Sequence, residues 1–440
     1  MSVPPALTWT CLLPQGSSLL CDSAPVWFLQ MLGPYEKQSQ RVRLSWGTPT
    51  GGDRGDLAAQ VIINGKVSRT ELEKQGFTYI RRFAAMPNLK RARWFIPLDS
   101  GAVASGAFSL YTPARTSARV KQVAAKALAR TRLPLWYRDH LTIASRELPP
   151  VEKVVASIFS DTTVRLALSA GAPEPARNRK PSFAVLNPQG SIIGVGKIGI
   201  SALARQITTH EALVLKALAD LPEAKFQAPK LLFTGDVDGH HLMVQSALAG
   251  GPAPAHWTPA HQYFLETLHR GSHKPAAYTA MMRSLTQRVP LLPVIGDRLQ
   301  SILEEITPTL EATKVPWTIV HGDFAPWNLR QSGGRISAFD WEYAQLDGLP
   351  LIDETHFRLQ VGYLLHHWSD EHAARELADV AASAPLGFTA QQARALQVVY
   401  LVDMLARLIE EGYDPNDEML TWYRRVLRRL SPSAKEVALV

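Results

Sequence analysis

Hydrophobic and polar positions are patterned most regularly between residues 151 and 250, where they predict a small sheet with one helix. Residues 151–159 predict a short helix, and apolar runs predict strands over 163–169, 182–186, 192–198, 230–234 and 242–246. Between the third and fourth strands, residues 203–219 place apolar side chains at helical spacing. Short polar turns separate most of these strands, so we expect an antiparallel sheet with the helix packed on it.

Beyond residue 250 the pattern changes to a helical one. Helices are predicted over 260–272, 276–288, 297–306, 354–368, 371–382, 389–410 and 416–430. The segment 316–353 interrupts them and has no regular period. The order of a small antiparallel sheet with one helix, followed by a mainly helical part, predicts an α+β fold with two lobes.

The first 150 residues predict a separate α/β extension. Strands are expected over 57–63 and 92–98, and a helix over 116–132. Another helix is expected to begin near Ser68, because Ser68 and Glu71 have the spacing of a capping box. Pro149-Pro150 then marks a boundary, so we predict three parts: 1–150, 151–250 and 251–440.

Composition narrows the class of protein. Of the 440 residues, 46% are hydrophobic and 20% charged, which excludes disordered and collagen-like chains. The two cysteines, Cys11 and Cys21, are too few for a disulfide framework and fit a reducing compartment. No basic residue lies between Met1 and Lys37, and no apolar run reaches about 18 residues, so we expect neither a secretory signal nor a membrane span. The predicted location is cytoplasmic.

The net charge of +8 is unevenly distributed. Residues 1–150 carry a balance of +11, whereas residues 151–440 carry −3. The positive charge is therefore a property of the N-terminal part, and it needs an explanation separate from the chemistry of the rest.

The irregular segment contains the residues best suited to catalysis. It holds His321-Gly322-Asp323 followed by Asn328, and then Asp340-Trp341-Glu342 after an apolar run. A carboxylate that orients a hydroxyl, together with an amide oxygen and a second carboxylate that hold a divalent metal, is the set of groups used in phosphoryl transfer. Magnesium takes oxygen ligands from one or two side chains and from substrate phosphates, which suits Asn328 and Asp340.

This pattern resembles the aminoglycoside phosphotransferase and choline kinase-like family, which has a protein kinase-like fold. The resemblance covers about residues 151–430 and implies an ATP- and Mg²⁺-dependent transfer of phosphate to a hydroxyl of a small molecule. It implies that Asp323 accepts the proton of that hydroxyl and that Asn328 and Asp340 ligate magnesium. His321 would order the loop, Glu342 would assist a metal or the substrate, and Asp353 would brace the helical lobe. Alternatively, Glu342 is a surface acid.

A nucleotide site of this type also needs a lysine on a strand, held by a glutamate on a helix. Lys197, on the predicted third strand, and Glu211, 14 residues later in the predicted helix, fit in type and order. Gly171 and Arg179 lie where a loop covering the phosphates is expected, although this loop lacks the glycine-rich kinase pattern. Gln245 and Ser246 follow the fifth strand, where the adenine-binding hinge is expected. The alternatives are a surface lysine, a solvated glutamate and an ordinary strand end.

Two other functions compete with a phosphotransferase. One is a nucleotide-binding scaffold without turnover, which the complete set of residues makes less favourable. The other is a dinucleotide-dependent oxidoreductase, because Gly194, Gly196 and Gly199 satisfy G-x-G-x-x-G. The predicted hairpins around these glycines disagree with the parallel βαβ unit that such a site requires.

The basic residues of segment 81–138 admit three explanations. They form a solvated face, they contact an anionic membrane surface through a basic amphipathic helix, or they bind nucleic acid. Nucleic acid is the least favoured because no motif for it accompanies the charge. A membrane contact would place the protein at the inner face of the membrane.

Overall fold

The structure is a computed structural model, and its described residues fall into two compact units. It describes residues 5–14, 17–22, 26, 28, 30, 32, 37, 42–45, 59–65, 67–110, 116–131, 133–171, 180–221 and 227–431. The first unit comprises the described residues up to 171, 180–212 and 230–247, and the second comprises 213–221, 227–229 and 248–431. Each unit is considered by itself.

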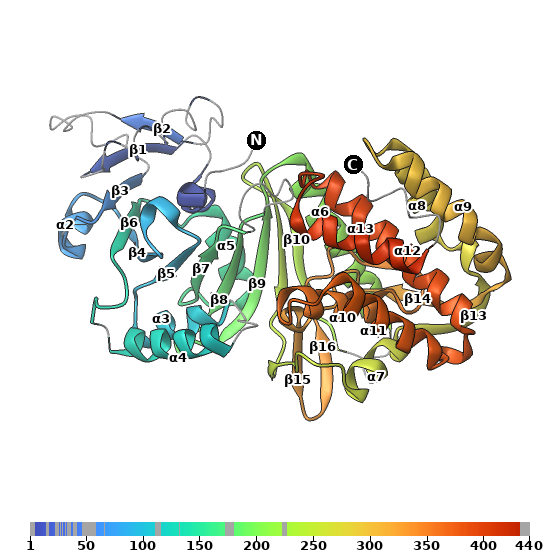
Figure 1. The fold of residues 1–440 in the computed structure, drawn as a ribbon. Coiled ribbons are helices and arrows are strands. Elements are labelled where there is room, and N and C mark those ends of the chain that lie inside the picture. Colours follow the sequence, from blue (N-terminus) through green and yellow to red (C-terminus); the bar gives the residue numbers. More distant parts are fainter. Residues whose placement is uncertain are drawn as a thin grey trace. The chain divides into compact units, whose positions relative to one another are not determined.

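The first unit is built on one sheet of eleven strands, in the order β10-β11-β9-β8-β7-β5-β4-β6-β3-β1-β2 (Figure 1). Neighbouring strands are antiparallel, except that β1 runs parallel to both β2 and β3. The strands are β1 Ser17–Asp22, β2 Val42–Ser45, β3 Ala59–Ile63, β4 Tyr79–Met86, β5 Trp94–Pro97, β6 Asp139–Ser145, β7 Arg165–Ser169, β8 Ser182–Leu186, β9 Ile192–Gly199, β10 Leu231–Val237 and β11 His240–Ser246.

The five strands predicted between residues 163 and 246 are confirmed as β7 to β11, and the helix between them as α6. They form the antiparallel end of the sheet, and α6 covers residues Ala202–Ala219. In the second unit the long helices predicted beyond residue 350 are confirmed. The predicted α+β class is therefore observed, although the predicted small sheet is one end of a larger one.

The predicted boundary after residue 150 does not separate two compact units. Strand β5 pairs with β7 through Trp94 with Ser169 and Phe95 with Leu168, so the N-terminal strands continue the sheet. One hydrophobic core runs beneath this junction and includes Phe83 and Phe95 on one side and Leu166 on the other. The N-terminal extension and the predicted N-lobe therefore form one unit.

Further helices accompany the sheet of the first unit, four of which are described over their full length. Helix α5 places Val151 and Val155 in the core, whereas α4 packs mainly against α3. The capping box expected at Ser68 is half present, because the Ser68 hydroxyl accepts the N–H of Glu71 at the start of α2. These helices are α2 Arg69–Lys74, α3 Gly101–Ala107, α4 Thr116–Arg130 and α5 Pro150–Phe159.

The second unit is mainly helical, and its core lies among α8, α9, α10, α11, α12 and α13. Helix α12 is buried along most of its length and packs against α9, α10, α11 and α13. The helices are α7 Pro259–Thr267, α8 Ala280–Arg288, α9 Gly296–Ala312, α10 Ile352–Leu364, α11 Asp370–Ala382, α12 Ala390–Glu410 and α13 Glu418–Leu430.

Two small antiparallel sheets accompany the helices, and β13 replaces the end of one predicted helix. The helix expected over 260–272 ends at residue 267, and β13 follows it and pairs with β14. The strands are β12 Gly251–Pro252, β15 Leu329–Ser332 and β16 Arg335–Ala338 in one sheet, and β13 His269–Pro275, β14 Lys314–Val320 and β17 Gln345–Gly348 in the other. Within the described part of the chain, no helix is both long and apolar enough to cross a membrane.

Candidate active site

The backbone at the end of β14 is held by one buried carboxylate. The two oxygens of Asp353, on α10, accept the backbone N–H groups of His321 at 2.7 Å and Gly322 at 2.9 Å. Burial raises the pKa of Asp353 to about 7, although these two backbone donors favour its ionised form. Gly322 has a φ of +80°, and a Cβ there would lie 2.3 Å from the carbonyl oxygen of Tyr343. Only glycine fits this turn.

His321 is a neutral, buried link within the loop that follows β14. Its Nδ1 accepts the backbone N–H of Asp323 at 3.2 Å, and its Nε2 donates to the carbonyl of Phe339 at 3.0 Å. Burial lowers the pKa of His321 to about 4, so the ring is uncharged near neutral pH. These contacts are those of a residue that orders the loop.

Asp323 and Asn328 are in direct contact. The Asn328 side-chain amide donates to the carboxylate of Asp323 at 2.8 Å and to its backbone carbonyl at 3.0 Å. With that nitrogen engaged, the side-chain oxygen is the atom that Asn328 can offer to a cation. The Asn328 carbonyl accepts the N–H of Phe339 at 3.0 Å, which ties this loop to the segment that carries Asp340.

Asp340 and Glu342 follow β16 and flank a buried tryptophan. Trp341 is fully buried, and its Nε1 donates to the carbonyl of Ala338 at 2.9 Å. The carboxylates of Asp340 and Glu342 each offer an oxygen within 4.8 Å of the other. Asp340 has a φ of +71°, a conformation uncommon outside glycine and enriched at functional sites. An amide oxygen and two carboxylates are donors that suit a hard cation such as Mg²⁺.

Three residues that the sequence analysis did not identify support this loop. The Nε2 atom of His356 lies 2.8 Å from Oδ1 of Asp323, and the hydroxyl of Tyr400 lies 3.1 Å from Nδ1 of His356. Arg407 donates to the carbonyl of Gly322 at 2.7 Å and lies 4.4 Å above the ring of Tyr343. His356 is three residues after Asp353 on α10, a spacing that places both on one helix face and is the one signal available from sequence.

The predicted lysine–glutamate pair lies in the first unit and is formed. Nζ of Lys197, on β9, lies 2.5 Å from a carboxylate oxygen of Glu211, on α6. Lys197 is 7% exposed and Glu211 is fully buried. The cross-strand position of Lys197 opposite Met243 sets it at the centre of the five-stranded end of the sheet.

The other predicted nucleotide residues are placed as follows. Gly171, after β7, has a φ of +83°. Gln245 is buried near the end of β11, and Ser246 exchanges hydrogen bonds with Lys230, at 2.9 Å in both directions. Arg179 lies outside the described residues.

The glycines at 194, 196 and 199 do not form a dinucleotide-binding turn. They lie within β9, which is antiparallel to both of its neighbours, β8 and β11. A Cβ on Gly196 would lie 2.1 Å from the ring of Phe183, and one on Gly194 would lie 2.6 Å from that of Phe159. Gly194 and Gly196 therefore make room for aromatic rings and Gly199 for the backbone of Arg205, so the oxidoreductase alternative loses its motif.

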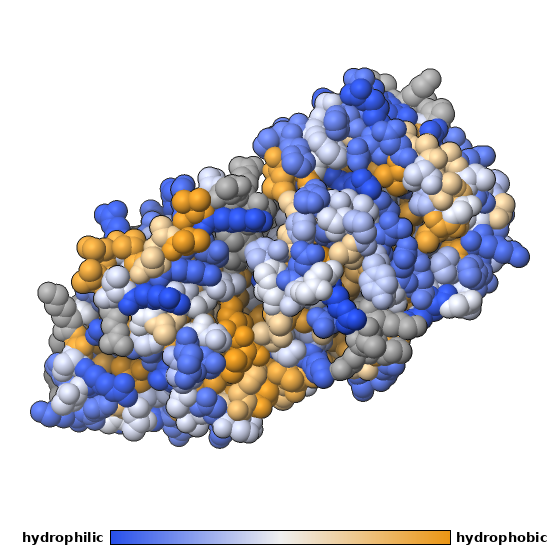
Figure 2. Space-filling view, turned by 90° about the horizontal axis from the view of Figure 1, so that it is seen from below, coloured by the Kyte–Doolittle hydropathy of each residue, from blue (hydrophilic) through white to orange (hydrophobic). Residues whose placement is uncertain are grey.

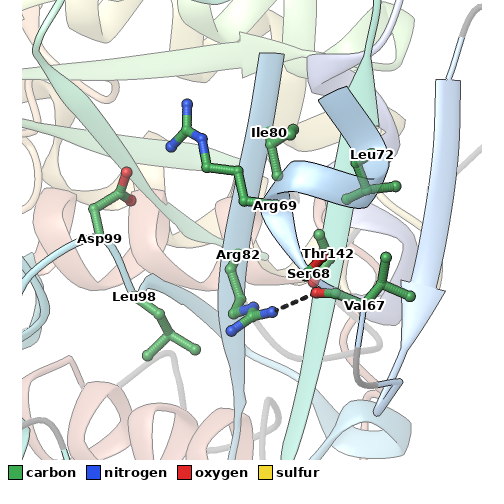
Figure 3. Close-up of a pocket in the computed structure, with 9 residues that line it drawn as sticks. All are labelled: Val67, Ser68, Arg69, Leu72, Ile80, Arg82, Leu98, Asp99 and Thr142. Carbon is green, nitrogen blue, oxygen red and sulfur yellow. Dashed lines mark hydrogen bonds between the residues drawn. The ribbon is translucent and has the colours of Figure 1, made fainter. Parts of the chain in front are cut away.

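A cavity of about 330 Å³ lies in the first unit, and none of the predicted site residues lines it (Figure 3). Arg82 points into it and donates to the carbonyl of Val67, and Arg69 pairs with Glu73. Both guanidinium groups on the cavity wall are thus engaged within the protein. The lining residues are Val67, Ser68, Arg69, Leu72, Ile80, Arg82, Leu98, Asp99 and Thr142.

Residues 201–396 match the model of the phosphotransferase enzyme family. The predicted family resemblance is confirmed. The matched segment includes the whole of the loop from His321 to Glu342 and the bracing residue Asp353.

Solved structures similar to this chain include three kinases of small molecules. A thermostable mutant of aminoglycoside phosphotransferase APH(4)-Ia is 14% identical, over 66% of this chain and 100% of its own, with a TM-score of 0.44. Choline kinase LicA from Streptococcus pneumoniae is 14% identical, over 64% and 98%, with a TM-score of 0.41. A putative fructosamine-3-kinase from Haemophilus somnus 129PT is 12% identical, over 64% and 96%, with a TM-score of 0.38. Among curated proteins, no match was found.

Proposed function

We propose that this protein transfers the γ-phosphate of ATP to a hydroxyl group of a small molecule, such as a sugar, an amino alcohol or an aminoglycoside-like compound. The observation that carries the proposal is the arrangement of Asp323, a partly exposed carboxylate held between the amide of Asn328 and the ring of His356. The match of residues 201–396 to the phosphotransferase enzyme family supports it.

In this mechanism Asp323 orients the acceptor hydroxyl and takes its proton. The new bond joins the hydroxyl oxygen to the γ-phosphorus, and the bond to the departing ADP breaks in line with it. Asp353, His321 and Asn328 hold the backbone and side chain of Asp323 in place. Most of the rate enhancement then comes from positioning and charge stabilisation, as is usual for phosphoryl transfer.

Asn328 and Asp340 would hold the magnesium ion, and Glu342 would support them. Their oxygen donors fit its preference, and the ion neutralises charge on the transferred phosphate when bound. In the first unit, Lys197 would contact the phosphates while Glu211 keeps it in position. Gly171 and Arg179 would line the phosphate side of the nucleotide site, and Gln245 and Ser246 its adenine side.

A direct assay tests this function. The protein is incubated with Mg²⁺ and ATP and a panel of sugars, amino alcohols and aminoglycosides, and both ADP and phosphorylated product are measured. We expect turnover with a hydroxylated acceptor, a loss of about 10³-fold or more in kcat for Asp323→Asn, and none for Asp379→Asn on the exposed surface of α11. Nucleotide binding without turnover on a broad panel would favour the scaffold alternative instead.

We also propose that the N-terminal basic segment contacts an anionic membrane surface through α4. This helix buries little: Ala129 faces the protein, while Val120 is 64% and Val123 is 66% exposed. Hydrophobic side chains are visible among hydrophilic ones on the side of the first unit where α3 and α4 lie (Figure 2). The chain continues beyond the helix with Leu133 and Leu135, which are 53% and 74% exposed.

Charge complements this exposed apolar face. At 100° per residue, Arg119, Lys126 and Arg130 lie along one flank of the face and Lys121 along the other. No acidic residue occurs between Asp99 and Asp139. Cations beside an outward apolar stripe are the arrangement of a helix that lies in the headgroup region of a bilayer with anionic lipid. Such a contact would place the protein at the cytoplasmic face of a membrane.

Vesicle co-sedimentation tests the membrane contact on the full chain. We expect salt-sensitive binding to vesicles with about 30% phosphatidylserine and little binding to neutral ones. The double variant Val120→Gln/Val123→Gln should weaken binding, whereas Leu291→Gln/Val294→Gln, which changes exposed apolar residues of the second unit, should not. Binding to duplex DNA but not to vesicles, or self-association that the α4 variant abolishes, would overturn the proposal.

A further inference from the structure

A hydrogen-bond network of buried polar side chains ends on the carboxylate of Asp323. Its first member is His356, on α10, which is 1% exposed and lies 33 residues after Asp323 in sequence. The Asp323 carboxylate therefore has a partner on each oxygen: Asn328 on Oδ2 and His356 on Oδ1, both at 2.8 Å.

The network continues through two tyrosines to a glutamine. The hydroxyl of Tyr400, on α12, lies 3.1 Å from Nδ1 of His356 and 3.3 Å from the hydroxyl of Tyr423, on α13. Nε2 of Gln360 donates to the Tyr423 hydroxyl at 3.0 Å. Tyr400, Tyr423 and Gln360 are 3%, 0% and 7% exposed. The network is therefore shielded from water between helices α10, α12 and α13.

Only one assignment of donors and acceptors satisfies every hydrogen bond in this network. An ionised carboxylate only accepts, so Nε2 of His356 carries the proton and Nδ1 is an acceptor. Tyr400 must then donate to Nδ1, which leaves its oxygen to accept from Tyr423, and Tyr423 in turn accepts from Gln360. Burial lowers the pKa of His356, against the raising effect of Asp323, which agrees with a neutral ring.

The geometry points to His356 as a positioning residue for phosphoryl transfer, fixed by Tyr400 in the tautomer that donates to Asp323. This inference rests on the proposed role of Asp323. The carboxylate is held at one oxygen by the loop itself and at the other by the helical core. Its remaining lone pairs are thereby aimed in one direction, toward the acceptor hydroxyl. Rotation of the carboxylate would misplace the base by about 1 Å, which is enough to cost about 100-fold in rate.

Steady-state kinetics on three variants tests this role. We expect His356→Phe, which keeps a ring but removes the donor, to lower kcat about 100-fold with the KM for ATP nearly unchanged. His356→Gln restores an N–H donor and should recover about 10-fold of that loss. Tyr400→Phe should lower kcat less, by about 3- to 10-fold, because it removes the donor to Nδ1 but leaves the ring and its Nε2–H in place.

A double-mutant cycle separates positioning from packing. If Tyr400 acts through His356, then Tyr400→Phe has no further effect in the His356→Phe background. The matched control is Tyr363→Phe, which removes a tyrosine hydroxyl that lies on α10 but does not belong to this hydrogen-bond network. It should leave kcat unchanged. Equal effects of Tyr400→Phe on kcat in both backgrounds, or a His356→Phe variant with full kcat, would show that this hydrogen-bond network has only a structural role.

A nitrogen NMR spectrum of the full chain with labelled histidine gives a readout independent of turnover. We expect the His356 signals of a neutral ring protonated at Nε2, with the Nδ1 signal shifted in Tyr400→Phe, which removes the hydroxyl that donates to Nδ1. A ring protonated at Nδ1 would overturn the inference even for an active enzyme. If instead the tautomer is as expected but Asp323→Asn retains full activity, the proposed function of Asp323 is what fails.

Discussion

Asp353 has no substrate contact in the proposed mechanism, but its substitution should disturb the candidate site more than that of any other supporting residue. Its oxygens accept two backbone N–H groups, and an amide at this position could accept only one. We expect Asp353→Asn to lower the free energy of unfolding by about 2 kcal/mol, measured by urea denaturation. Asp379→Asn on the surface of α11 should change it by less than about 0.5 kcal/mol. Equal stabilities for the two variants would contradict this brace.

His321 predicts how stability changes with pH. The pKa of this buried ring is lowered from 6.5 to about 4 by burial. Above pH 6.5 both folded and unfolded states are neutral, and below it the unfolded state takes up a proton that the folded state refuses. Stability should therefore fall as the pH drops from 6.5 toward 4, by up to about 3 kcal/mol from this group. Urea unfolding at pH 7, 5.5 and 4.5 should show a smaller fall for His321→Gln than for the wild type, and parallel falls would refute the assignment.

At the scale of single elements, β9 shows how a sequence motif can have a packing cause. Gly196 lies opposite Phe183 on β8, whose ring occupies the space of a Cβ. Gly196→Ala should destabilise the protein by about 1–3 kcal/mol, because the ring must leave its rotamer or the strands must separate. Gly271→Ala, on β13, has no atom within 4 Å of the added Cβ and serves as the control. Thermal unfolding compares them, and equal midpoints would contradict the packing account.

The elements that sequence predicted well are continuous apolar runs, as in β8 and α12, or amphipathic helices, as in α11. Strands β8 and β9 and helices α11 and α12 fall within a residue or two of their predicted bounds. Strand β13 was missed because its residues, His269–Pro275, are mostly polar and none is buried, so no alternation marks them. Local motifs also located Asp323, Asn328 and Asp340. His356, Tyr400 and Arg407 escaped because their contacts depend on how distant helices pack, which spacing along the chain does not encode.

The whole first unit depends on the junction between β5 and β7. Phe95 is fully buried there, in the same core as Leu168 and as Val155 of α5. The sequence boundary at Pro149-Pro150 is a turn into α5, and the hydrophobic core passes across it. A chain that begins at residue 151 would therefore expose one edge of β7 and lose the aromatic side chains that share a core with α5.

This junction predicts the outcome of deleting residues 1–150. Each large apolar side chain removed from the core withdraws about 1.5–3 kcal/mol, and Phe83 and Phe95 are two of several. We expect the truncated chain to unfold at a midpoint about 10 °C or more below that of the full-length protein and to bind a hydrophobic dye. The full-length variant Val120→Gln/Val123→Gln should keep the wild-type midpoint, because those side chains face outward. An intact midpoint in the truncated chain would show that residues 151–440 fold independently. Otherwise, a membrane contact of α4 must be tested by substitution within the full chain, since deletion would remove the fold together with the helix.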